Sequence, residues 1–364
     1  MRKIIIFLLI SSLTSISVSA NDALPKEELH ALWKQRIQSI LNKGKLPLID
    51  METSLKHEHV VRYVPEIFET FDELGIALVA ADGYQDSKDG RKGYRWSDYI
   101  YQLSLEYPHI FIPTANGGTN RNWTQQKTGG NSFINQLENE MLTGKYHHMG
   151  EIEFRHYMSG HQCRRNKTHR DVSISIDEDF GDRVLSLSEK TGLPVSIHLE
   201  VENEELVKLD RALTKHPRAK VIVAHFGQKR HPYKQTDFTP DYVRSLLTRH
   251  ANLYFDLANG HPNRKYICSG KNLNETLVGD NSLWDSNFGL QSDHLSPDWE
   301  NILETFSTRF VFASDYGGWR PELSGYLEKK VHNFHIQIKN LSPEAKSNIA
   351  YKNAWKLLDG NKWQ

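Results

Sequence analysis

An alternation of short apolar runs with amphipathic stretches constrains the fold of this chain more than any other feature. After a first helical stretch from about Pro25 to Lys43, strand-like and helix-like segments alternate about eight times, with no low-complexity segment or linker between them. Such alternation implies parallel strands with right-handed crossovers. About eight units over this length are what a (β/α)8 TIM barrel needs. A doubly wound open sheet is the alternative, but no glycine-rich phosphate loop follows the first strand.

The predicted strands are short and mainly apolar, as expected for strands that are buried on both faces. They lie at residues 46–51, 75–81, 109–113, 150–154, 194–200, 220–227, 252–257 and 309–315. Apolar residues at helical spacing predict helices at residues 25–43, 67–74, 96–107, 131–143, 180–190, 204–215, 241–249, 299–306, 323–339 and 343–358. We therefore expect one barrel domain with an N-terminal helix and long loops at the carboxyl ends of its strands.

The first twenty residues have the three parts of a secretory signal. Met1-Arg2-Lys3 is basic, Ile4 to Ile10 is apolar, and small residues lead to a cleavage site at Ala20. We expect residues 1–20 to be removed and residues 21–364 to form the domain of a periplasmic or secreted protein. An uncleaved anchor is the alternative, but the apolar core is short for a membrane span.

The charge balance argues against a nucleic acid or membrane partner, and the cysteine content allows one disulfide. The 45 basic and 45 acidic residues balance, which removes the electrostatic argument for nucleic acid or an acidic membrane surface. We therefore expect a small molecule as the partner, and the sequence gives no sign of an oligomeric state. In an exported protein the two cysteines, Cys163 and Cys268, could form a disulfide or remain independent thiols.

Several predicted strands deliver a metal-binding or proton-transferring side chain at or near one end. These side chains are Glu151 or Glu153, His198, His225, Asp256 and Asp315. In a barrel all such ends converge on one face, so these residues would meet there. Imidazole and carboxylate ligands suit zinc, manganese or iron. A histidine at one strand end is as often an ordinary hydrogen-bonded core residue, and Asp256 could simply cap its strand.

In order and spacing, these residues resemble the amidohydrolase superfamily, in particular its amidohydrolase-related group of metal-dependent barrel enzymes. In that family the fourth strand supplies a glutamate or modified lysine, which matches Glu151 in Gly-Glu-Ile-Glu. The histidines of the fifth and sixth strands match His198 in Val-Ser-Ile-His and His225 in Val-Ala-His-Phe-Gly. The aspartate of the eighth strand matches Asp315 in Phe-Ala-Ser-Asp, and residues 353–358 look like the family's last helix.

The first strand departs from the family pattern. The family has an aspartate followed by His-x-His, whereas Asp50 here is followed by Glu52 and Ser54 at the histidine positions. Glu52 can still bind a metal, but serine is a poor ligand. The resemblance therefore implies one divalent ion rather than two, with zinc favoured over manganese or iron. Its expected ligands are Glu151, His198 and His225, with Asp315 and Glu52 nearby.

Basic and aromatic residues follow the strand ends and suggest an anionic substrate. Arg155 and His156 follow the fourth strand, and Trp319 and Arg320 follow the eighth. Because guanidinium groups match carboxylates, we expect these residues to bind a carboxylate on the substrate, although solvated surface residues would give the same pattern. Of the two acids on the fourth strand, we expect Glu151 to enter the site and Glu153 to face the helices.

The leading functional hypothesis is a metal-dependent hydrolase of an amide, ester or lactone bond. Asp315 would act as general base and then proton donor, while His225 would bind the ion or stabilise the oxyanion. A non-oxidative decarboxylase of the same barrel fold is a second enzymatic option. The lost first-strand histidines also allow a metal-free relative that only binds a small anion. A structural or adhesion protein would leave the converging polar groups unexplained.

Overall fold

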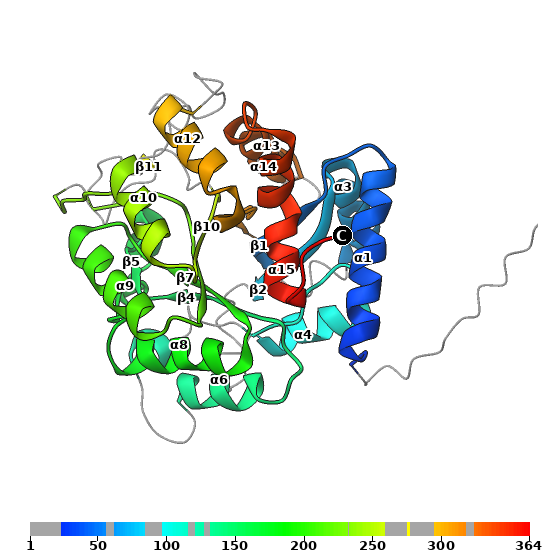
Figure 1. The fold of residues 1–364 in the computed structure, drawn as a ribbon. Helices are drawn as coiled ribbons and strands as arrows, with labels where there is room; N and C mark the ends of the chain where they lie inside the picture. Colours follow the sequence, from blue (N-terminus) through cyan, green and yellow to red (C-terminus); the bar gives the residue numbers. More distant parts are fainter. Residues whose placement is uncertain are drawn as a thin grey trace, which may run out of the picture.

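The fold consists of parallel strands with helices packed around them (Figure 1). The computed structural model describes residues 23–55, 62–83, 97–115, 121–126, 132–231, 233–258, 275–276, 295–317 and 324–364. One sheet has the order β13-β1-β2, made of Tyr316–Gly317, Leu48–Leu55 and Ile76–Gly83. The other has the order β12-β10-β8-β7-β4-β3, made of Phe310–Val311, Leu253–Asp256, Lys220–Val223, Pro194–His198, His148–Glu153 and Thr114–Ala115. All pairs in both sheets are parallel, which confirms the predicted α/β class.

The two sheets meet at two places through individual backbone hydrogen bonds. Met51 N donates to Phe312 O at 3.1 Å, next to β12. On the other side Val79 of β2 forms a parallel bridge with Phe111, and Ile112 N donates to Val79 O at 2.9 Å. The strand predicted at residues 109–113 is therefore reduced to this bridge. Turn hydrogen bonds from Ile110 N and Phe111 N to Tyr107 O occupy the start of that segment, so the regular strand β3 begins only at Thr114.

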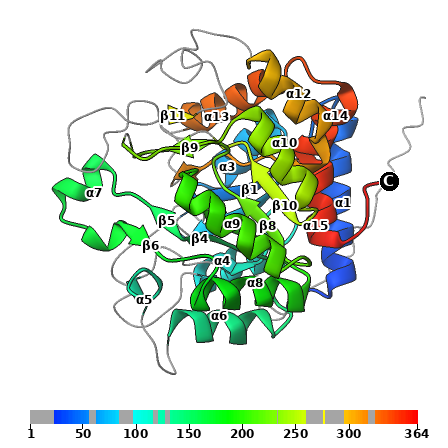
Figure 2. The same cartoon turned by 60° about the vertical axis from the view of Figure 1, so that its left-hand side comes forward.

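The helices surround the strands (Figure 2). They are α1 (Lys26–Asn42), α3 (Val64–Leu74), α4 (Ser97–Glu106), α5 (Arg121–Thr124), α6 (Phe133–Met141), α7 (Gly160–Arg164), α8 (Asp179–Thr191), α9 (Asn203–Lys215), α10 (Pro240–Arg249), α12 (Pro297–Thr305), α13 (Ser324–Gln337), α14 (Pro343–Ser347) and α15 (Asn353–Asp359). The N-terminal helix α1 lies beside α15 near the end of the chain, and His30 Nδ1 bonds to Asp359 Oδ1 at 2.6 Å. Helix α8 ends at Gly192, whose φ of 70° is the left-handed conformation that glycine adopts without strain.

The closing helix predicted at residues 343–358 is interrupted. A π-helical turn, Asn348–Lys352, separates α14 from α15. Asn353, at the start of α15, donates from Nδ2 to the carbonyl oxygens of Ser307 and Phe310 at 2.7 and 2.8 Å. These bonds fasten α15 to the start of β12, a tertiary contact that helical periodicity cannot reveal.

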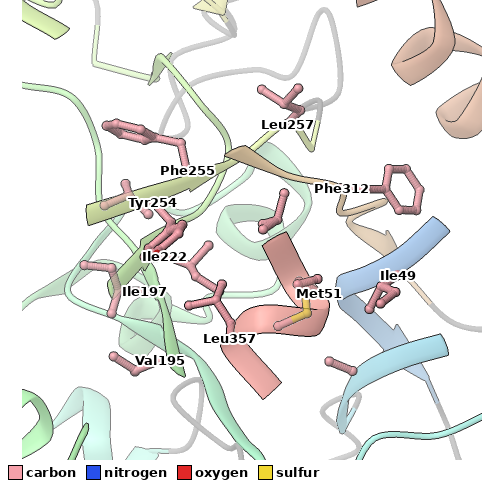
Figure 3. Close-up of a cluster of buried hydrophobic side chains, with 14 of the residues drawn as sticks. Ile49, Met51, Val195, Ile197, Ile222, Tyr254, Phe255, Leu257, Phe312 and Leu357 are labelled. Carbon is pink, nitrogen blue, oxygen red and sulfur yellow. The ribbon is translucent and has the colours of Figure 1, made fainter. Parts of the chain in front are cut away.

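The core is formed by apolar side chains of the strands, as the continuous apolar runs predict (Figure 3). Val195 and Ile197 of β7, Ile222 of β8 and Phe255 of β10 are at most 1% exposed. Leu357 of α15 packs into the same cluster. This packed cluster holds neighbouring strands in fixed register, so the polar residues near their carboxyl ends have fixed positions.

Two short antiparallel strand pairs were not anticipated. Strand β5 (Arg155–His156) pairs with β6 (Val172–Ser173), and β9 (Gln228–Lys229) pairs with β11 (Glu275–Thr276). Between β5 and β6, Cys163 of α7 is disulfide-bonded. The other cysteine, Cys268, lies outside the described residues, as do the predicted signal at residues 1–20 and most of the loop at residues 260–297. In the part of the chain that the structure describes, no helix has the length and apolar character of a membrane span.

Candidate metal centre

Five ionisable side chains, on five neighbouring strands or directly after them, form two overlapping groups. Glu151 lies near His198 and His225, and Glu52 lies near His225 and Asp256, with the possible ligand atoms of each group within 4.8 Å of one another. Glu151 lies on β4, His198 ends β7 and Glu52 lies on β1. His225 lies in the loop after β8, and Asp256 ends β10. His225 belongs to both groups. Parallel register explains the convergence, because the carboxyl ends of neighbouring strands open to the same side.

Glu151 owes its position to the glycine before it. Gly150 has φ 119°, and a Cβ at this position would lie 2.4 Å from the carbonyl oxygen of Ser196 on β7. The register of β4 against β7 shifts between Met149 and Ile152, so Glu151 lies in a local irregularity of the strand. Only glycine permits this backbone and this close approach. The result is a carboxylate whose Oε1 lies 2.7 Å from His198 Nδ1 and 3.4 Å from His225 Nε2.

His198 is held between two carboxylates. Its Nδ1 faces Glu151, and its Nε2 lies 3.4 Å from Oε1 of Glu200, which is fully buried. Arg230 N donates to Glu200 Oε2 at 2.7 Å, and Arg230 Nε lies 3.4 Å from Oε1. Burial alone would lower the pKa of His198, but Glu151 and Glu200 outweigh it and raise this pKa to about 9. Burial opposes ionisation of Glu151, yet His198 and His225 hold its pKa well below the usual range.

The second group contains buried polar atoms that have no hydrogen-bond partner among the described residues. They are Glu52 Oε2, Asp256 Oδ2 and His225 Nδ1. Asp256 Oδ1 is used, because it accepts from His225 N at 2.8 Å and from Ala258 N at 3.0 Å. Burial first, and then the charges of Glu151 and Asp256, raise the pKa of Glu52 well above its usual range. Burial also raises the pKa of Asp256. An excess of buried carboxylates with orphaned oxygens fits a cation, so the donor set is suitable for a divalent metal.

Two residues at the site have left-handed backbones, which are uncommon for residues other than glycine. His225 has φ 57° and Asp315 has φ 46°. Each follows a strand and has its amide fixed, since His225 N donates to Asp256 Oδ1 and Asp315 N donates to Glu52 O at 3.0 Å. Such conformations persist where the surroundings determine them, and they cluster at functional sites.

Asp315 lies beside the centre, but among the described residues it belongs to neither metal-binding group. Its side chain is 31% exposed, and its Oδ2 lies 3.7 Å from Lys330 Nζ. Its charge contributes to the raised pKa of Glu52. Asp315 therefore lies at the edge of the centre and is partly open to solvent.

Asp50, the first residue of the altered motif, has a structural role. Its Oδ1 accepts from Ser314 N at 2.9 Å and from Glu52 N at 3.2 Å, and its Oδ2 accepts from Ser314 Oγ at 2.6 Å. Burial raises its pKa to about 7, against the effect of these hydrogen bonds. Asp50 thus fixes Glu52 and the segment that leads to Asp315.

The expectation that Glu153 faces the helices is wrong. Residues two apart on a strand share a face, and Glu153 is in register with His198 of β7. Its Oε2 accepts from Arg170 Nη1 at 2.7 Å, its Oε1 contacts Arg170 Nη2, and it lies 3.8 Å from His156 Nε2. Burial raises the pKa of Glu153 in spite of Arg170. Glu153 therefore lies next to the centre, with its charge paired to a buried arginine.

The predicted substrate-binding residues have contacts within the chain. Arg155 Nη1 donates to Asp171 Oδ1 at 2.9 Å and to Val172 O at 2.6 Å, and its guanidinium lies 3.4 Å from the centre of the Tyr157 ring. His156 is buried, donates from Nδ1 to Arg170 O at 2.7 Å, and has its ring 4.9 Å from that of His198. These contacts hold the β5–β6 strand pair against the centre. Trp319 and Arg320 lie outside the described residues.

Sequence reasoning missed the residues that support the ligands. Glu200 contacts His198 and is itself held by Arg230, and Arg170 pairs with Glu153. Glu200 could have been identified from the sequence, because it lies two positions after His198 in the same apolar run. Arg170 lies in a 3-10 turn and Arg230 directly follows β9, and in such polar segments charge alone does not distinguish a buried partner from a solvated side chain.

A family model described as amidohydrolase matches residues 148–360. A search of curated proteins finds no match.

Among solved structures, a 4-oxalomesaconate hydratase from Rhodopseudomonas palustris is 14% identical, with 91% of this chain and 92% of that chain covered and a TM-score of 0.45. An amidohydrolase from Burkholderia multivorans with bound zinc is 10% identical, with 86% and 99% covered and a TM-score of 0.43. An amidohydrolase from Bifidobacterium longum subsp. infantis is 11% identical, with 86% and 99% covered and a TM-score of 0.44. Because the family model spans more than half of the 364 residues, the chain belongs to the amidohydrolase family, and it is an enzyme.

Proposed function

We propose that this protein is a metal-dependent hydrolase that cleaves an amide, ester or lactone bond of a small, carboxylate-bearing substrate. The observation that carries the proposal is the grouping of Glu151, His198 and His225 at adjoining strand ends. Membership of the amidohydrolase family supports the reaction class.

One divalent ion, with zinc as the first candidate, would be held by Glu151, His198 and His225. Two imidazoles and one carboxylate are a ligand set that zinc favours in catalytic sites, where one position remains open for water or substrate. When bound, the ion supplies Lewis acidity, which makes water a better nucleophile near neutral pH and polarises a carbonyl group. Glu52, whose Oε1 lies 3.6 Å from His225 Nε2, borders the same space.

The chain's own residues supply the proton transfers. Asp315 takes a proton from the attacking water and returns it to the leaving group. Its partial exposure gives it access to both, and its Oδ2 lies 3.7 Å from Lys330 Nζ. His225, when it is not bound to the ion, can donate a hydrogen bond to the oxygen that becomes negative during the attack.

The substrate's carboxylate would bind to Arg155, His156, Trp319 and Arg320. Support for Arg155 and His156 comes from their position on β5, directly after the strand that carries Glu151. The arginine-rich character of these loops fits an anionic group.

We also propose that the strands complete an eight-stranded TIM barrel within a single domain at residues 21–364. The hydrogen bonds that join β1 to Phe312 and Val79 to the segment before β3 support it. A signal at residues 1–20 would direct the protein to the periplasm or outside the cell, without a nucleic acid or membrane partner.

A direct test compares metal-depleted protein with protein reloaded with zinc on a panel of small amides, esters and lactones that carry a carboxylate. We expect zinc-dependent hydrolysis and its loss in Asp315→Asn. Release of carbon dioxide without hydrolysis would instead identify a decarboxylase. A protein that is purified without chelator, holds almost no metal and still binds carboxylates would favour a metal-free binding role and reject the proposal.

A further inference from the structure

A cavity lies at the amino ends of β3 and β4, whereas the metal centre lies toward the carboxyl ends of the strands. It is bounded by α1, by α4 and by the segments that lead into the two strands, where Pro113 and His147 directly precede β3 and β4 (Figure 1). Its volume is about 120 Å³, and its apolar wall includes Leu29, Leu105 and Pro108. An apolar cavity of roughly 150 Å³ accepts a benzene ring. The cavity between α1 and α4 therefore has room for about one ring.

His147 presents a ring nitrogen without a hydrogen-bond partner to this cavity. The residue lines the cavity and is only 6% exposed. Its Nδ1 faces His30 Nε2 at 3.4 Å, and its Nε2 has no hydrogen-bond partner among the described residues. A polar atom that is largely withdrawn from water costs free energy unless it is hydrogen-bonded. Nε2 of His147 is therefore the atom of the cavity wall that a ligand would satisfy.

A chain of hydrogen bonds fixes the direction in which this nitrogen bonds. His30 Nδ1 donates to Asp359 Oδ1 at 2.6 Å, so a neutral His30 ring has its lone pair on Nε2, facing His147. Burial lowers the pKa of both histidines, that of His147 to about 4, so both rings are neutral near neutral pH. His30 Nε2 therefore accepts from Nδ1–H of His147. Nε2 of His147 is consequently an acceptor and requires a donor, such as a hydroxyl group, on the ligand.

Two lysines give the rim of the cavity a positive charge. Lys26, at the start of α1, and Lys145, before β4, both line the cavity and are exposed. Neither forms an ion pair with another described residue, and none of the described residues that line the cavity is acidic. Lys145 Nζ lies 5.8 Å from the centre of the Tyr101 ring, a cation–π contact that holds the ammonium at this rim. The rim therefore suits an anionic group.

We propose that this cavity binds a small aromatic hydroxy acid, at a site separate from the metal centre. The hydroxyl donates to His147 Nε2, the ring packs against Leu29 and Leu105, and the carboxylate lies at the rim near Lys145. An apolar wall with a few polar groups that fix the orientation is the usual composition of a small-molecule site. None of these residues belongs to the metal centre, so the site does not depend on the proposed function.

The test measures the dissociation constants of 4-hydroxybenzoate, benzoate and phenol by isothermal titration calorimetry near neutral pH, with the protein as purified. We expect 4-hydroxybenzoate to bind about three- to tenfold more tightly than benzoate, which lacks the hydroxyl. His147→Asn keeps an amide donor for His30 and removes the acceptor at the position of Nε2. This variant should therefore bind 4-hydroxybenzoate and benzoate equally.

A second substitution tests the rim. Lys145→Met should weaken the binding of both acids about threefold or more and leave phenol, which has no carboxylate, unchanged. Lys43→Met is the matched control, because Lys43 is an exposed lysine that pairs with Asp72 and does not line the cavity. This control should bind all three compounds as the wild type does.

Leu105→Trp approaches the cavity from α4 and fills it, so a folding defect of His147→Asn does not decide the outcome. Circular dichroism of each variant checks its fold. Leu105→Trp should abolish the binding of 4-hydroxybenzoate. Absence of binding to the wild type would overturn the inference. Binding that is unchanged in folded Leu105→Trp and His147→Asn would also overturn it, because the acid would then bind elsewhere, such as in the loops at the metal centre. No step of this test measures hydrolysis, so failure of the proposed function leaves its outcome unaffected.

Discussion

Nε2 of His198 lies 3.4 Å from Oε1 of Glu200, and Nδ1 of the same ring faces Glu151. A histidine that binds a metal through one nitrogen commonly donates the other N–H to a carboxylate, which fixes the ring and raises its basicity. Glu200, fully buried and held by Arg230, is in the position to do this.

Glu200→Gln should therefore weaken zinc binding about 10–100-fold while the fold is retained. Metal competition against a chromogenic chelator measures the change. Glu202→Gln is a matched control, because Glu202 is also buried but bonds to Tyr157 at 2.5 Å instead of to His198. Equal effects of the two substitutions would show that Glu200 has no special relation to the metal ligand.

The protonation of His198 predicts that the stability of the metal-free protein depends on pH. Its folded pKa of about 9 lies above the ordinary value of 6.5, because Glu151 and Glu200 outweigh burial. Protonated His198 therefore contributes up to roughly 3 kcal/mol to the free energy of unfolding. This contribution is complete below about pH 6.5 and is lost as the pH rises through about 9. Urea denaturation between pH 6 and 10 measures it. His198→Gln should flatten this dependence, and a wild-type protein that gains stability over the same interval would contradict the assignment.

Gly150 is predicted to be essential for the position of Glu151. Gly150→Ala combines a φ of 119° with a Cβ 2.4 Å from the carbonyl oxygen of Ser196. We expect a loss of more than about 1 kcal/mol in the free energy of unfolding, together with weaker zinc binding. Gly144→Ala is the control, because Gly144 has φ 73° but no atom within 4 Å of the added Cβ. If the two variants lose stability and zinc affinity equally, the close approach to β7 is not what places Glu151.

The sequence predicted the parts of this site that depend on strand ends. Apolar runs that carry Glu151, His198 and His225 mark neighbouring parallel strands, and the parallel order brings these residues together. The partners of these residues could not be predicted in the same way. Arg170 reaches Glu153 from a 3-10 turn, and its sequence context resembles that of any solvated basic loop.

Asp256 was underestimated for a related reason. An aspartate at a strand end is usually a cap, and its Oδ1 does accept two backbone amides here. The orphaned Oδ2 next to Glu52 is a property of two strands that are distant in sequence. The left-handed backbone of His225 is likewise fixed by a hydrogen bond to Asp256, so the local sequence around His225 does not predict it.

The ion pair between Glu153 and Arg170 predicts the largest loss of stability. Arg170→Met would leave Glu153 as an unpaired carboxylate that is 1% exposed, next to Glu151. Removal of one partner of a buried pair costs about 3–5 kcal/mol, whereas replacement of both partners by neutral groups is often nearly neutral. Chemical denaturation at pH 7 should therefore show a large loss for Arg170→Met and a substantial recovery when Glu153→Gln is added. Lys43→Met, which breaks the exposed pair with Asp72, should cost less than about 1 kcal/mol. If Arg170→Met costs no more than Lys43→Met, Glu153 must reach water or another cation, and the buried pairing beside the metal centre is wrong.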